Sequence, residues 1–350
     1  MLRQLTILCV ALASLTALTT AATAADGFFL AIGGINGKAD DGHVLEGQFG
    51  TIYRSADGEE WTEVFKGGPV TDDFNHARNN QLRCLTYGRG RFVVTGNPHA
   101  VLVSEDGVKW RVVEAPSGSM SVEFGNGMFL APNASQFLVS TDGLKWEDRK
   151  PDVDFPIWGK DGAGHVRKTV FGNGVFVCVG EQRIGVTRDG SSWLQHRILP
   201  ESERPGRNIL LFGNGRFVWL CEKTGPQSSV DGITWEPITT FGELSARAVF
   251  GQSGVFDGKQ FLTSPSVWND ENKIIFASQD GVTWTRAVEH AQATSFSTAG
   301  NGRLLQNQGW SNSFTVSADG GKTWKQIKCD IPSRQVYFFD GQRIIGQSGG

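Results

Sequence analysis

Short apolar stretches alternate with polar, glycine-rich turns along most of the chain. In one instance, Phe212-Gly-Asn-Gly-Arg-Phe217, two aromatic residues flank a turn sequence that separates two apolar runs. Glycine and asparagine accept the positive φ angles of two-residue turns, so the pattern predicts two antiparallel strands joined tightly. We call it the hairpin turn. Its spacing recurs at Tyr87–Phe92, Phe124–Phe129, Phe171–Phe176, Phe212–Phe217, Phe256–Phe261, Ala299–Leu304 and Phe339–Ile344.

A second pattern, Ser/Thr-x-Asp-Gly-x-x-Trp, alternates with the hairpin turns, and we call it the Asp turn. Its last copy, Ser317-Ala-Asp319-Gly-Gly321-Lys-Thr323-Trp324, is one residue longer than the others. Successive aspartates are separated by 49, 36, 47, 42, 49 and 39 residues. Repeats of about 40 residues are typical of propeller blades and solenoids. The seven aspartates are Asp57, Asp106, Asp142, Asp189, Asp231, Asp280 and Asp319.

Together the two patterns predict an all-β, seven-bladed β-propeller over residues 26–350, with four antiparallel strands in each blade. Strand A of a blade ends at the first aromatic of the hairpin turn, and strand B follows its glycines. Strand C enters the Asp turn, and strand D starts at its tryptophan. The chain begins with a B-like strand at 28–32 and ends with an A–B pair at 336–346. The ring is therefore expected to close by joining the terminal strands, which leaves one B strand surplus, either 28–32 or 343–346.

The Asp turns are interpreted as structural. An aspartate can accept hydrogen bonds from the N–H groups of its own turn, a serine or threonine can add another, and the glycine permits a left-handed backbone. The tryptophan buries a large ring between neighbouring sheets. Calcium requires six to eight converging oxygens, whereas each of these carboxylates stands alone in its turn. No metal or cofactor is expected.

The N-terminus and the charge balance indicate where the protein acts. Arg3 is the only charged residue before Asp26, the run from Leu5 to Leu18 is mainly apolar, and Ala22-Thr-Ala24 offers a cleavage site. Residues 1–25 are thus predicted to be a signal peptide, and the protein to be secreted or periplasmic. No later stretch is long and apolar enough to span a membrane. Without Arg3, 32 basic against 36 acidic residues give a net charge of −4, which argues against nucleic-acid binding.

The cysteines offer no redox or zinc motif, because Cys84, Cys178, Cys221 and Cys329 share no short spacing. Cys178 and Cys221 lie in apolar, strand-like runs and are interpreted as small buried side chains. A disulfide is compatible with export, but the spacing does not define one.

The Asp turns resemble those of the Asp-box (BNR-repeat) propeller superfamily. The last copy matches the family pattern Ser-x-Asp-x-Gly-x-Thr-Trp in full, and the other six match a shortened form. That resemblance covers residues 26–350 and implies a fold rather than one activity, since the superfamily includes six-bladed sialidases, seven-bladed xyloglucan hydrolases, photosystem assembly factors and protein-sorting receptors.

Sialidase chemistry does not carry over from this resemblance. The sialidase aromatic-Arg-Ile-Pro segment is not matched by Tyr53-Arg54-Ser55-Ala56. Sialidases also need a tyrosine nucleophile, whereas Tyr53, Tyr87 and Tyr337 all lie in predicted strands.

Propeller topology places hairpin turns and Asp turns on one face, so a ligand site is expected on the other face and around the central channel. Four residues before the hairpin aromatic, the inner strands carry a mostly polar set. Arginines converging there would bind a carboxylate or sulfate, although a channel lined by solvated polar groups is the favoured interpretation. The set is Arg83, Met120, Arg167, Asn208, Gln252, Ser295 and Gln335, with Arg207 and Arg334 one residue earlier.

Long connections before blades two, four and five add candidate acids and bases for glycoside hydrolysis or polysaccharide cleavage, namely Asp73, His76, Asp161, His165 and Glu203. Solvated loops have the same composition, which is the favoured interpretation. Three tryptophans outside the repeats, Trp158, Trp268 and Trp310, suit sugar stacking or a protein contact, or pack beneath their own loops.

The sequence thus leads to two main hypotheses. The first is a monomeric, non-catalytic binding propeller that recognises a glycan or an envelope or extracellular protein at the channel mouth. The alternative is a carbohydrate-active enzyme, a glycoside hydrolase or polysaccharide lyase, acting on an acidic sugar. An assembly scaffold for an envelope complex is a third idea.

Overall fold

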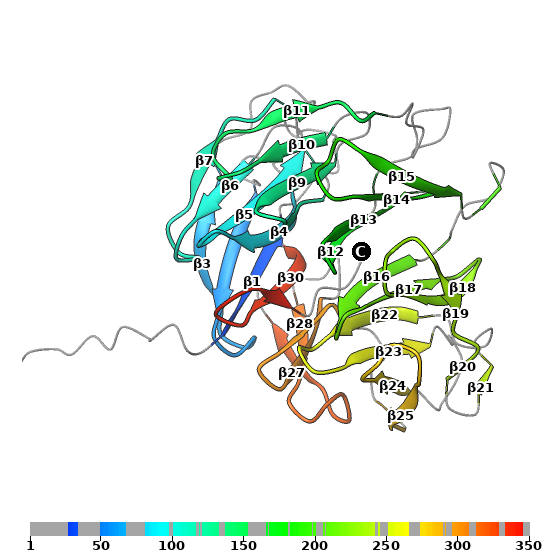
Figure 1. Ribbon diagram of the computed structural model, residues 1–350. Coiled ribbons are helices and arrows are strands. Elements are labelled where there is room, and N and C mark those ends of the chain that lie inside the picture. Colours follow the sequence, from blue (N-terminus) through cyan, green and yellow to red (C-terminus); the bar gives the residue numbers. More distant parts are fainter. Residues whose placement is uncertain are drawn as a thin grey trace, which may run out of the picture.

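The computed structural model is a seven-bladed β-propeller, as predicted, with the blades arranged around a central channel (Figure 1). Within the described residues there is no helix, and hence none that could cross a membrane. The described residues are 27–33, 50–67, 81–97, 101–116, 119, 121–132, 137–152, 166, 168–180, 183–197, 199–200, 206, 208–241, 244–245, 251–265, 274–289, 291, 296–307, 313–328 and 333–345.

Blades 2 to 4 each consist of four consecutive antiparallel strands, ordered from the channel outward. Blade 2 contains β4 (Gln81–Gly88), β5 (Arg91–Asn97), β6 (Val101–Ser104) and β7 (Arg111–Val113). Blade 3 contains β8 (Glu123–Gly125), β9 (Met128–Pro132), β10 (Phe137–Ser140) and β11 (Glu147–Arg149). Blade 4 contains β12 (Lys168–Gly172), β13 (Val175–Val179), β14 (Arg183–Thr187) and β15 (Trp193–Arg197).

Blades 5 to 7 repeat this arrangement. Blade 5 contains β16 (Asn208–Gly213), β17 (Arg216–Cys221), β18 (Gly225–Ser229) and β19 (Glu236–Pro237). A small hairpin of β20 (Thr240–Phe241) and β21 (Leu244–Ser245) follows it. Blade 6 contains β22 (Gly251–Phe256), β23 (Phe261–Pro265), β24 (Ile275–Ser278) and β25 (Thr285–Val288). Blade 7 contains β26 (Thr298–Gly300), β27 (Arg303–Asn307), β28 (Ser313–Ser317) and β29 (Lys325–Lys328).

Blade 1 closes the ring with strands from both ends of the chain. It joins β1 (Phe28–Gly33), β2 (Thr51–Ser55) and β3 (Thr62–Lys66) to β30 (Ser333–Phe339) and β31 (Ile344–Ile345). β30 pairs with β1 on one side and with β31 on the other, as in the pairs Leu30↔Tyr337 and Phe338↔Ile345. The surplus strand is therefore β31, which lies at the inner edge of blade 1. The sequence left this choice open.

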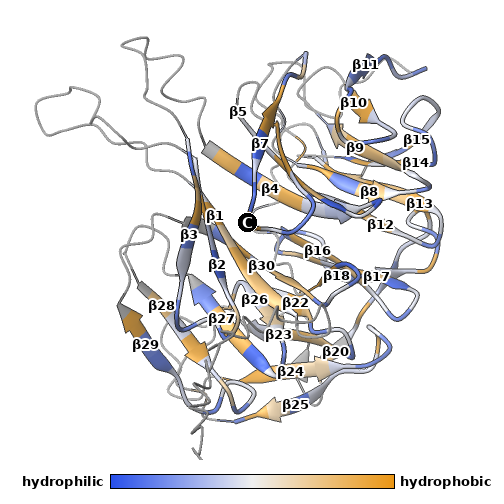
Figure 2. Ribbon diagram, turned by 90° about the vertical axis from the view of Figure 1, so that its left-hand side faces the viewer, coloured by the Kyte–Doolittle hydropathy of each residue, from blue (hydrophilic) through white to orange (hydrophobic). Residues whose placement is uncertain are grey.

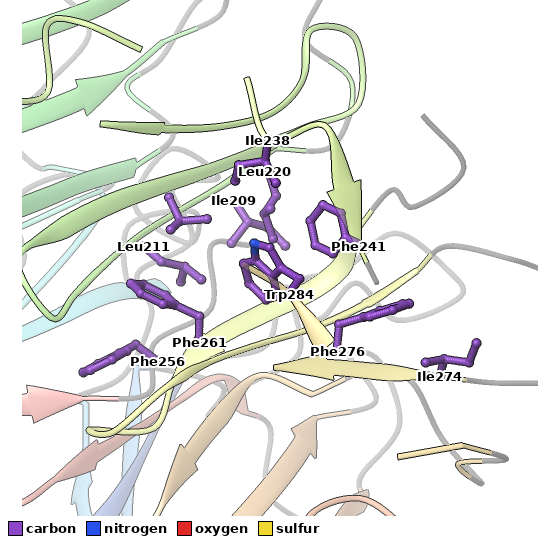
Figure 3. Close-up of a cluster of buried hydrophobic side chains, with 11 residues drawn as sticks. Ile209, Leu211, Leu220, Ile238, Phe241, Phe256, Phe261, Ile274, Phe276 and Trp284 are labelled. Carbon is purple, nitrogen blue, oxygen red and sulfur yellow. The ribbon is translucent and has the colours of Figure 1, made fainter. Parts of the chain in front are cut away.

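The core consists of apolar layers between neighbouring blades. In Figure 2 the two middle strands of blade 3, β9 and β10, are largely hydrophobic, whereas its outermost strand β11 is hydrophilic. Figure 3 shows the layer between blades 5 and 6, where Leu211 of blade 5 and the rings of Phe261, Phe276 and Trp284 of blade 6 are buried together. Because each blade buries a face against both neighbours, the ring behaves as one packed unit.

The two glycines of a Gly-Asn-Gly hairpin turn have different roles. Asn173 and Gly174 have φ angles of 47° and 76°, as a two-residue turn of mirror-image type requires. The first glycine, Gly172, has no positive φ, but a Cβ there would lie 2.2 Å from the Phe212 ring of the next blade. It therefore provides the space in which that aromatic packs against the backbone, a role that the sequence pattern alone did not indicate.

The Asp turns have the structural role predicted for them. In blade 5, Asp231 Oδ1 accepts hydrogen bonds from the Ile233 and Thr234 amides at 2.8 and 2.7 Å. Ser229 Oγ accepts from the Gly232 amide at 2.8 Å and donates to Asp231 Oδ1 at 3.0 Å. The same turn packs against the preceding blade, because a Cβ at Gly232 would lie 2.4 Å from the Val177 side chain. The other six turns repeat the aspartate and serine or threonine bonds.

Three of the four cysteines expected in the mature chain are described. Cys84, Cys178 and Cys221 are buried and unbridged, which confirms the interpretation of Cys178 and Cys221 as small core side chains. Burial raises the pKa of the Cys178 thiol to about 12, and the thiol lies 3.4 Å from the Thr169 hydroxyl. Cys329 lies outside the described residues.

Candidate functional site

Most side chains that the sequence singled out lie outside the described part of the chain, so their proposed roles stay predictions. For Gln252 and Arg334 the strand backbone is described and the side chain is not. The residues outside it altogether are Asp73, His76, Met120, Trp158, Asp161, His165, Arg167, Glu203, Arg207, Trp268, Ser295 and Trp310.

Three members of the predicted polar ring are described, and they lie on three blades. Arg83 and Asn208 are partly exposed residues of the innermost strands β4 and β16, and Gln335 is a partly exposed residue of β30, the neighbour of the inner-edge strand β31. The buried Tyr337 hydroxyl donates to Gln335 Oε1 at 2.6 Å and lies 3.4 Å from the Arg83 carbonyl. Tyr337 thus ties blade 1 to blade 2, a structural role.

The central channel contains a cavity of about 720 Å³. Its walls come from the inner strands β4, β8, β12 and β16, and β31 bounds it on the side of blade 1. The cavity reaches the hairpin-turn face, since the turn residues Arg89, Asn173, Asn214 and Arg343 also line it. The described channel cavity is thus on the side of the Asp turns, whereas the connections of the opposite face lie largely outside the described residues.

Two charged side chains, Glu123 of β8 and Lys168 of β12, stand in the wall of this cavity. Glu123 Oε1 accepts hydrogen bonds from the Thr86 hydroxyl and from the Phe124 amide, both at 3.0 Å. Only 6% of the Lys168 surface is exposed. The Lys168 side chain forms no hydrogen bond or ion pair with the described residues, although Glu123 and Cys84 are close enough to act on it electrostatically.

Burial shifts the pKa values of both groups toward their neutral forms. It raises the pKa of Glu123 despite the hydrogen bonds from Phe124 and Thr86 and the charge of Lys168. It lowers the pKa of Lys168, although electrostatic interactions with Cys84 and Glu123 oppose that shift. Desolvation thus outweighs the mutual attraction of the pair.

The sequence reasoning missed Glu123 and Lys168, although a signal was present. The inner strands carry three residues between the predicted polar ring and the hairpin aromatic, such as Cys84-Leu-Thr86 in blade 2. Across all seven blades, Glu123 and Lys168 are the only charged residues at these positions. A charge at an otherwise uncharged repeat position indicates a local role that the fold itself does not require.

A second concavity, of about 510 Å³, lies between blades 4 and 5. We call it the blade 4–5 groove. Val186 and Trp193 form part of its floor, and Leu194, Val230 and Ile233 line it with 59%, 54% and 43% of their surfaces exposed. Leu194 follows the Asp turn of blade 4, and Val230 and Ile233 belong to that of blade 5. The fold of the Asp turn does not require apolar residues at these positions, because other copies of the turn carry polar residues there.

Comparisons with known proteins show likeness in fold. No protein-family model matches the chain, and no curated protein matches its sequence. A streptogramin B lyase superposes with a TM-score of 0.52 at 11% identity, over 75% of this chain and 91% of the lyase. Virginiamycin B lyase from Staphylococcus aureus gives 0.51 at 13%, over 76% and 94%. YCF48 from Cyanidioschyzon merolae gives 0.51 at 14%, over 76% and 93%.

The shared property is the propeller. At these identities the likeness extends to the fold alone, so function has to be argued from the sites of this chain.

The described sites differ in the chemistry that they allow. The channel wall offers one carboxyl group and one amine, whereas glycoside hydrolysis needs two carboxyl groups about 5–10 Å apart. Among the described residues no three His, Cys, Asp or Glu side chains are grouped closely enough to hold a metal ion. The blade 4–5 groove offers apolar contact area and three carboxyl groups, and each of these accepts a hydrogen bond from a backbone amide. They are those of Asp152, Asp189 and Asp231.

Proposed function

We propose that this chain is a non-catalytic binding propeller that recognises a partner protein through the blade 4–5 groove. The observation that carries the proposal is the exposure of three aliphatic side chains, Leu194, Val230 and Ile233, around one concavity. Exposed apolar side chains that gather around a concave surface are typical of interaction sites. Isolated apolar side chains are common on protein surfaces, but here three of them lie around one groove.

The surroundings of the groove support a protein ligand. The charged residues Asp152, Arg188, Asp189 and Asp231 also line it, so an apolar centre has a polar border, the usual anatomy of protein–protein interfaces. The floor is rigid, because Trp193 is 5% exposed and its indole donates to the Gly190 carbonyl at 3.0 Å. A pre-formed floor lowers the entropic cost of binding.

A glycan fits the described surface less well. Sugars bind to exposed aromatic faces, whereas the exposed large hydrophobic residues of the described chain are all aliphatic. The tryptophans of several Asp turns, such as Trp146 and Trp284, are 9% and 2% exposed. The exposed set is Val108, Val112, Leu194, Val230, Ile233 and Val282.

The proposal includes export. A cleaved signal peptide over residues 1–25 would place the propeller in the periplasm or outside the cell, so the partner is an envelope or extracellular protein. The Asp-turn pattern supports kinship with the Asp-box propellers, some of which bind proteins. N-terminal sequencing of the protein purified from its source tests the export step, because a mature chain that starts at Met1 would contradict it.

Site-specific photo-crosslinking tests the groove. A photoreactive phenylalanine at Leu194 should crosslink one defined protein in the source organism, while the same residue at Val112, which is 68% exposed on blade 2, should not. Leu194→Asp should then weaken binding of that purified protein by at least about 2 kcal/mol, roughly 30-fold, as for an interface hot spot. Equal crosslinking from both positions would rule out the groove as the binding site.

A carbohydrate-active enzyme acting on an acidic sugar is the second candidate, and Glu123 and Lys168 favour it. Groups with pKa values shifted by burial in a cavity are typical of acid–base catalysis. It ranks second because the described channel wall carries a single carboxyl group. Incubation with uronic-acid and sialylated glycans decides the matter, since turnover that is lost in Glu123→Gln would establish catalysis and displace the binding proposal.

A further inference from the structure

Lys168 is a charged residue at a position of the inner strand that is uncharged in the other six blades. At the equivalent position of the other inner strands stand Cys84, Ser121, Ile209, Ser253, Phe296 and Val336, all uncharged. Lys168 is buried, with 6% of its surface exposed, and it lines the channel cavity. A buried ammonium without a partner is costly, so its presence needs a compensating interaction. Glu123 acts on it electrostatically, but none of the described side chains forms a hydrogen bond or ion pair with the Lys168 ammonium.

We propose that the channel cavity binds a ligand with a carboxylate and an apolar body, and that the carboxylate contacts Lys168 Nζ. The proposal is independent of the partner protein proposed for the blade 4–5 groove. It concerns a different cavity, different side chains and a smaller ligand.

Glu123 is arranged to assist Lys168. Both hydrogen bonds that its carboxyl group accepts, from the Thr86 hydroxyl and the Phe124 amide, end on Oε1. Oε2 accepts none from the described residues, so a protonated Glu123 carries its proton there and has a donor to offer. The raised pKa of Glu123 favours that protonated form. The ligand carboxylate can then accept from Lys168 and from Glu123, and charge-assisted bonds of this kind are the strong ones.

The charges around the cavity select an anion. Three cationic side chains line it, namely Lys168 in the wall and Arg89 and Arg343 at the hairpin-turn rim, against the single acidic Glu123. Arg343 is paired with Asp340 at 3.6 Å, so Lys168 and Arg89 are the cations that a ligand would meet, and a neutral ligand would leave Lys168 without a hydrogen-bonded anion. Because the cavity is enclosed by the protein on several sides, these charges act more strongly than on an open surface.

Part of the remaining wall suits an apolar body. Val170 and Leu211 contribute aliphatic side chains from blades 4 and 5, and Ile344 and Ile345 contribute two more from β31. Thr86 in the wall and Asn173, Asn214 and Gln342 at the rim are polar, so the apolar body is expected to lie against the aliphatic side chains and away from the rim. Two sources provide the required chemistry: a free apolar monocarboxylic acid, or the free C-terminus of a peptide that ends in an apolar residue.

Calorimetric titration of the purified full chain tests the proposal. Octanoate should bind at least about tenfold more tightly than octanol, which lacks the charge, and octylamine should not bind. A peptide ending in leucine with a free carboxylate, compared with its amide, then distinguishes the two sources. Octanol binding as tightly as octanoate would overturn the proposal.

Variants assign the site within the chain. Lys168→Met should lower octanoate affinity about tenfold to a hundredfold, whereas Lys145→Met, at an exposed position, should leave it unchanged. Glu123→Gln keeps an acceptor and a donor and should retain binding, while Glu123→Leu should weaken it. Unchanged affinity in a folded Lys168→Met protein would contradict the assignment.

A measurement on the wild-type protein decides the matter even if Lys168→Met does not fold. A diazirine analogue of octanoate should crosslink to residues lining the channel, such as Val170 and Leu211. Crosslinks confined to other surfaces would overturn the proposal.

Discussion

Asn173 Nδ2 lies 2.8 Å from the carbonyl oxygen of Val230, across the boundary between blades 4 and 5. The same nitrogen donates to the Gly215 carbonyl at 2.8 Å. Asn126 and Asn214 make the equivalent pairs of bonds across the boundaries on either side. Each of these asparagines thus ties its own hairpin turn to the hairpin turn and the Asp turn of the next blade.

Replacing Asn173 by glycine isolates the contribution of this bond pair. Glycine keeps the positive φ of the turn and removes both donors, so Asn173→Gly should lower the free energy of unfolding by about 1–2 kcal/mol. Asn301 is the matched control, because it has a φ of 50° in the same kind of turn but makes no such bond in the described structure. Urea denaturation of both variants checks this, and equal losses would show that the bonds across the boundary contribute nothing.

Alanine substitutions at the two glycines of the blade 5 hairpin turn should destabilise the protein for different reasons. A Cβ at Gly213 would lie 2.2 Å from the Phe256 ring, whereas one at Gly215 meets nothing within 4 Å but sits at a φ of 75°. Gly213→Ala should cost about 3 kcal/mol or more through overpacking, and Gly215→Ala about 1–2 kcal/mol through backbone strain. Denaturant midpoints give both values.

A double-mutant cycle separates the two causes. Phe256→Leu should recover part of the loss in Gly213→Ala, because it removes the ring that the new methyl group meets, and none of the loss in Gly215→Ala. Recovery of the same size in both would show that the aromatic contact is not the cause.

Local sequence was sufficient to predict the blades. The hairpin turn around Asn173 and the Asp turn at Asp189 are specified by residues within a few positions of each other, so their repetition fixed the number of blades and the strand order. The contacts between neighbouring blades could not be predicted from the sequence. Asn173 and Val230, or Gly172 and Phe212, are distant in sequence and meet only after the ring has formed.

The candidate site in the channel was predicted less well, because it too depends on residues that are distant in sequence. The surplus strand was ambiguous because Phe28 and Ile344 lie in equally strand-like runs, and only the pairing of β30 decides between them. Glu123 and Lys168 belong to different blades, and neither occurs in a recognisable motif. Of the predicted polar ring, Arg83 and Gln335 do lie on inner strands, while the candidate acids and histidines of the long connections stay predictions.

The Asp turns should make the propeller sensitive to acid. Burial alone would raise the pKa of Asp280, but the amides of Thr283 and Val282 and the hydroxyls of Thr283 and Ser278 outweigh it and lower the pKa to about 2. Because this folded-state pKa lies below the value of about 3.9 expected in the unfolded chain, the charged form is favoured by folding. Its contribution is fully present above the unfolded pKa and is lost as the pH falls through the folded one.

Comparing the wild type with Asp280→Asn measures that contribution. The difference in unfolding free energy should be constant above about pH 5 and shrink between about pH 4 and 2, because protonation makes the aspartate resemble the amide. Asp148→Asn is the control, since Asp148 is exposed on β11 and accepts no hydrogen bond in the described structure. A difference that stays constant down to pH 2 would contradict the role of the Asp280 charge.

Lys168 should reduce the stability of the ligand-free protein, as expected of a side chain retained for binding. The pKa of Lys168 is lowered by burial, against its electrostatic interactions with Cys84 and Glu123. Between this folded pKa and the unfolded value near about 10.4, the unfolded chain binds more protons, so stability should rise with pH in that window. Lys168→Met should remove this dependence and raise the free energy of unfolding at pH 7 by about 1–3 kcal/mol. Denaturant unfolding from pH 7 to 10, with Lys145→Met as control, checks both effects, and a Lys168→Met protein that is less stable at every pH would show that Lys168 already has a stabilising partner.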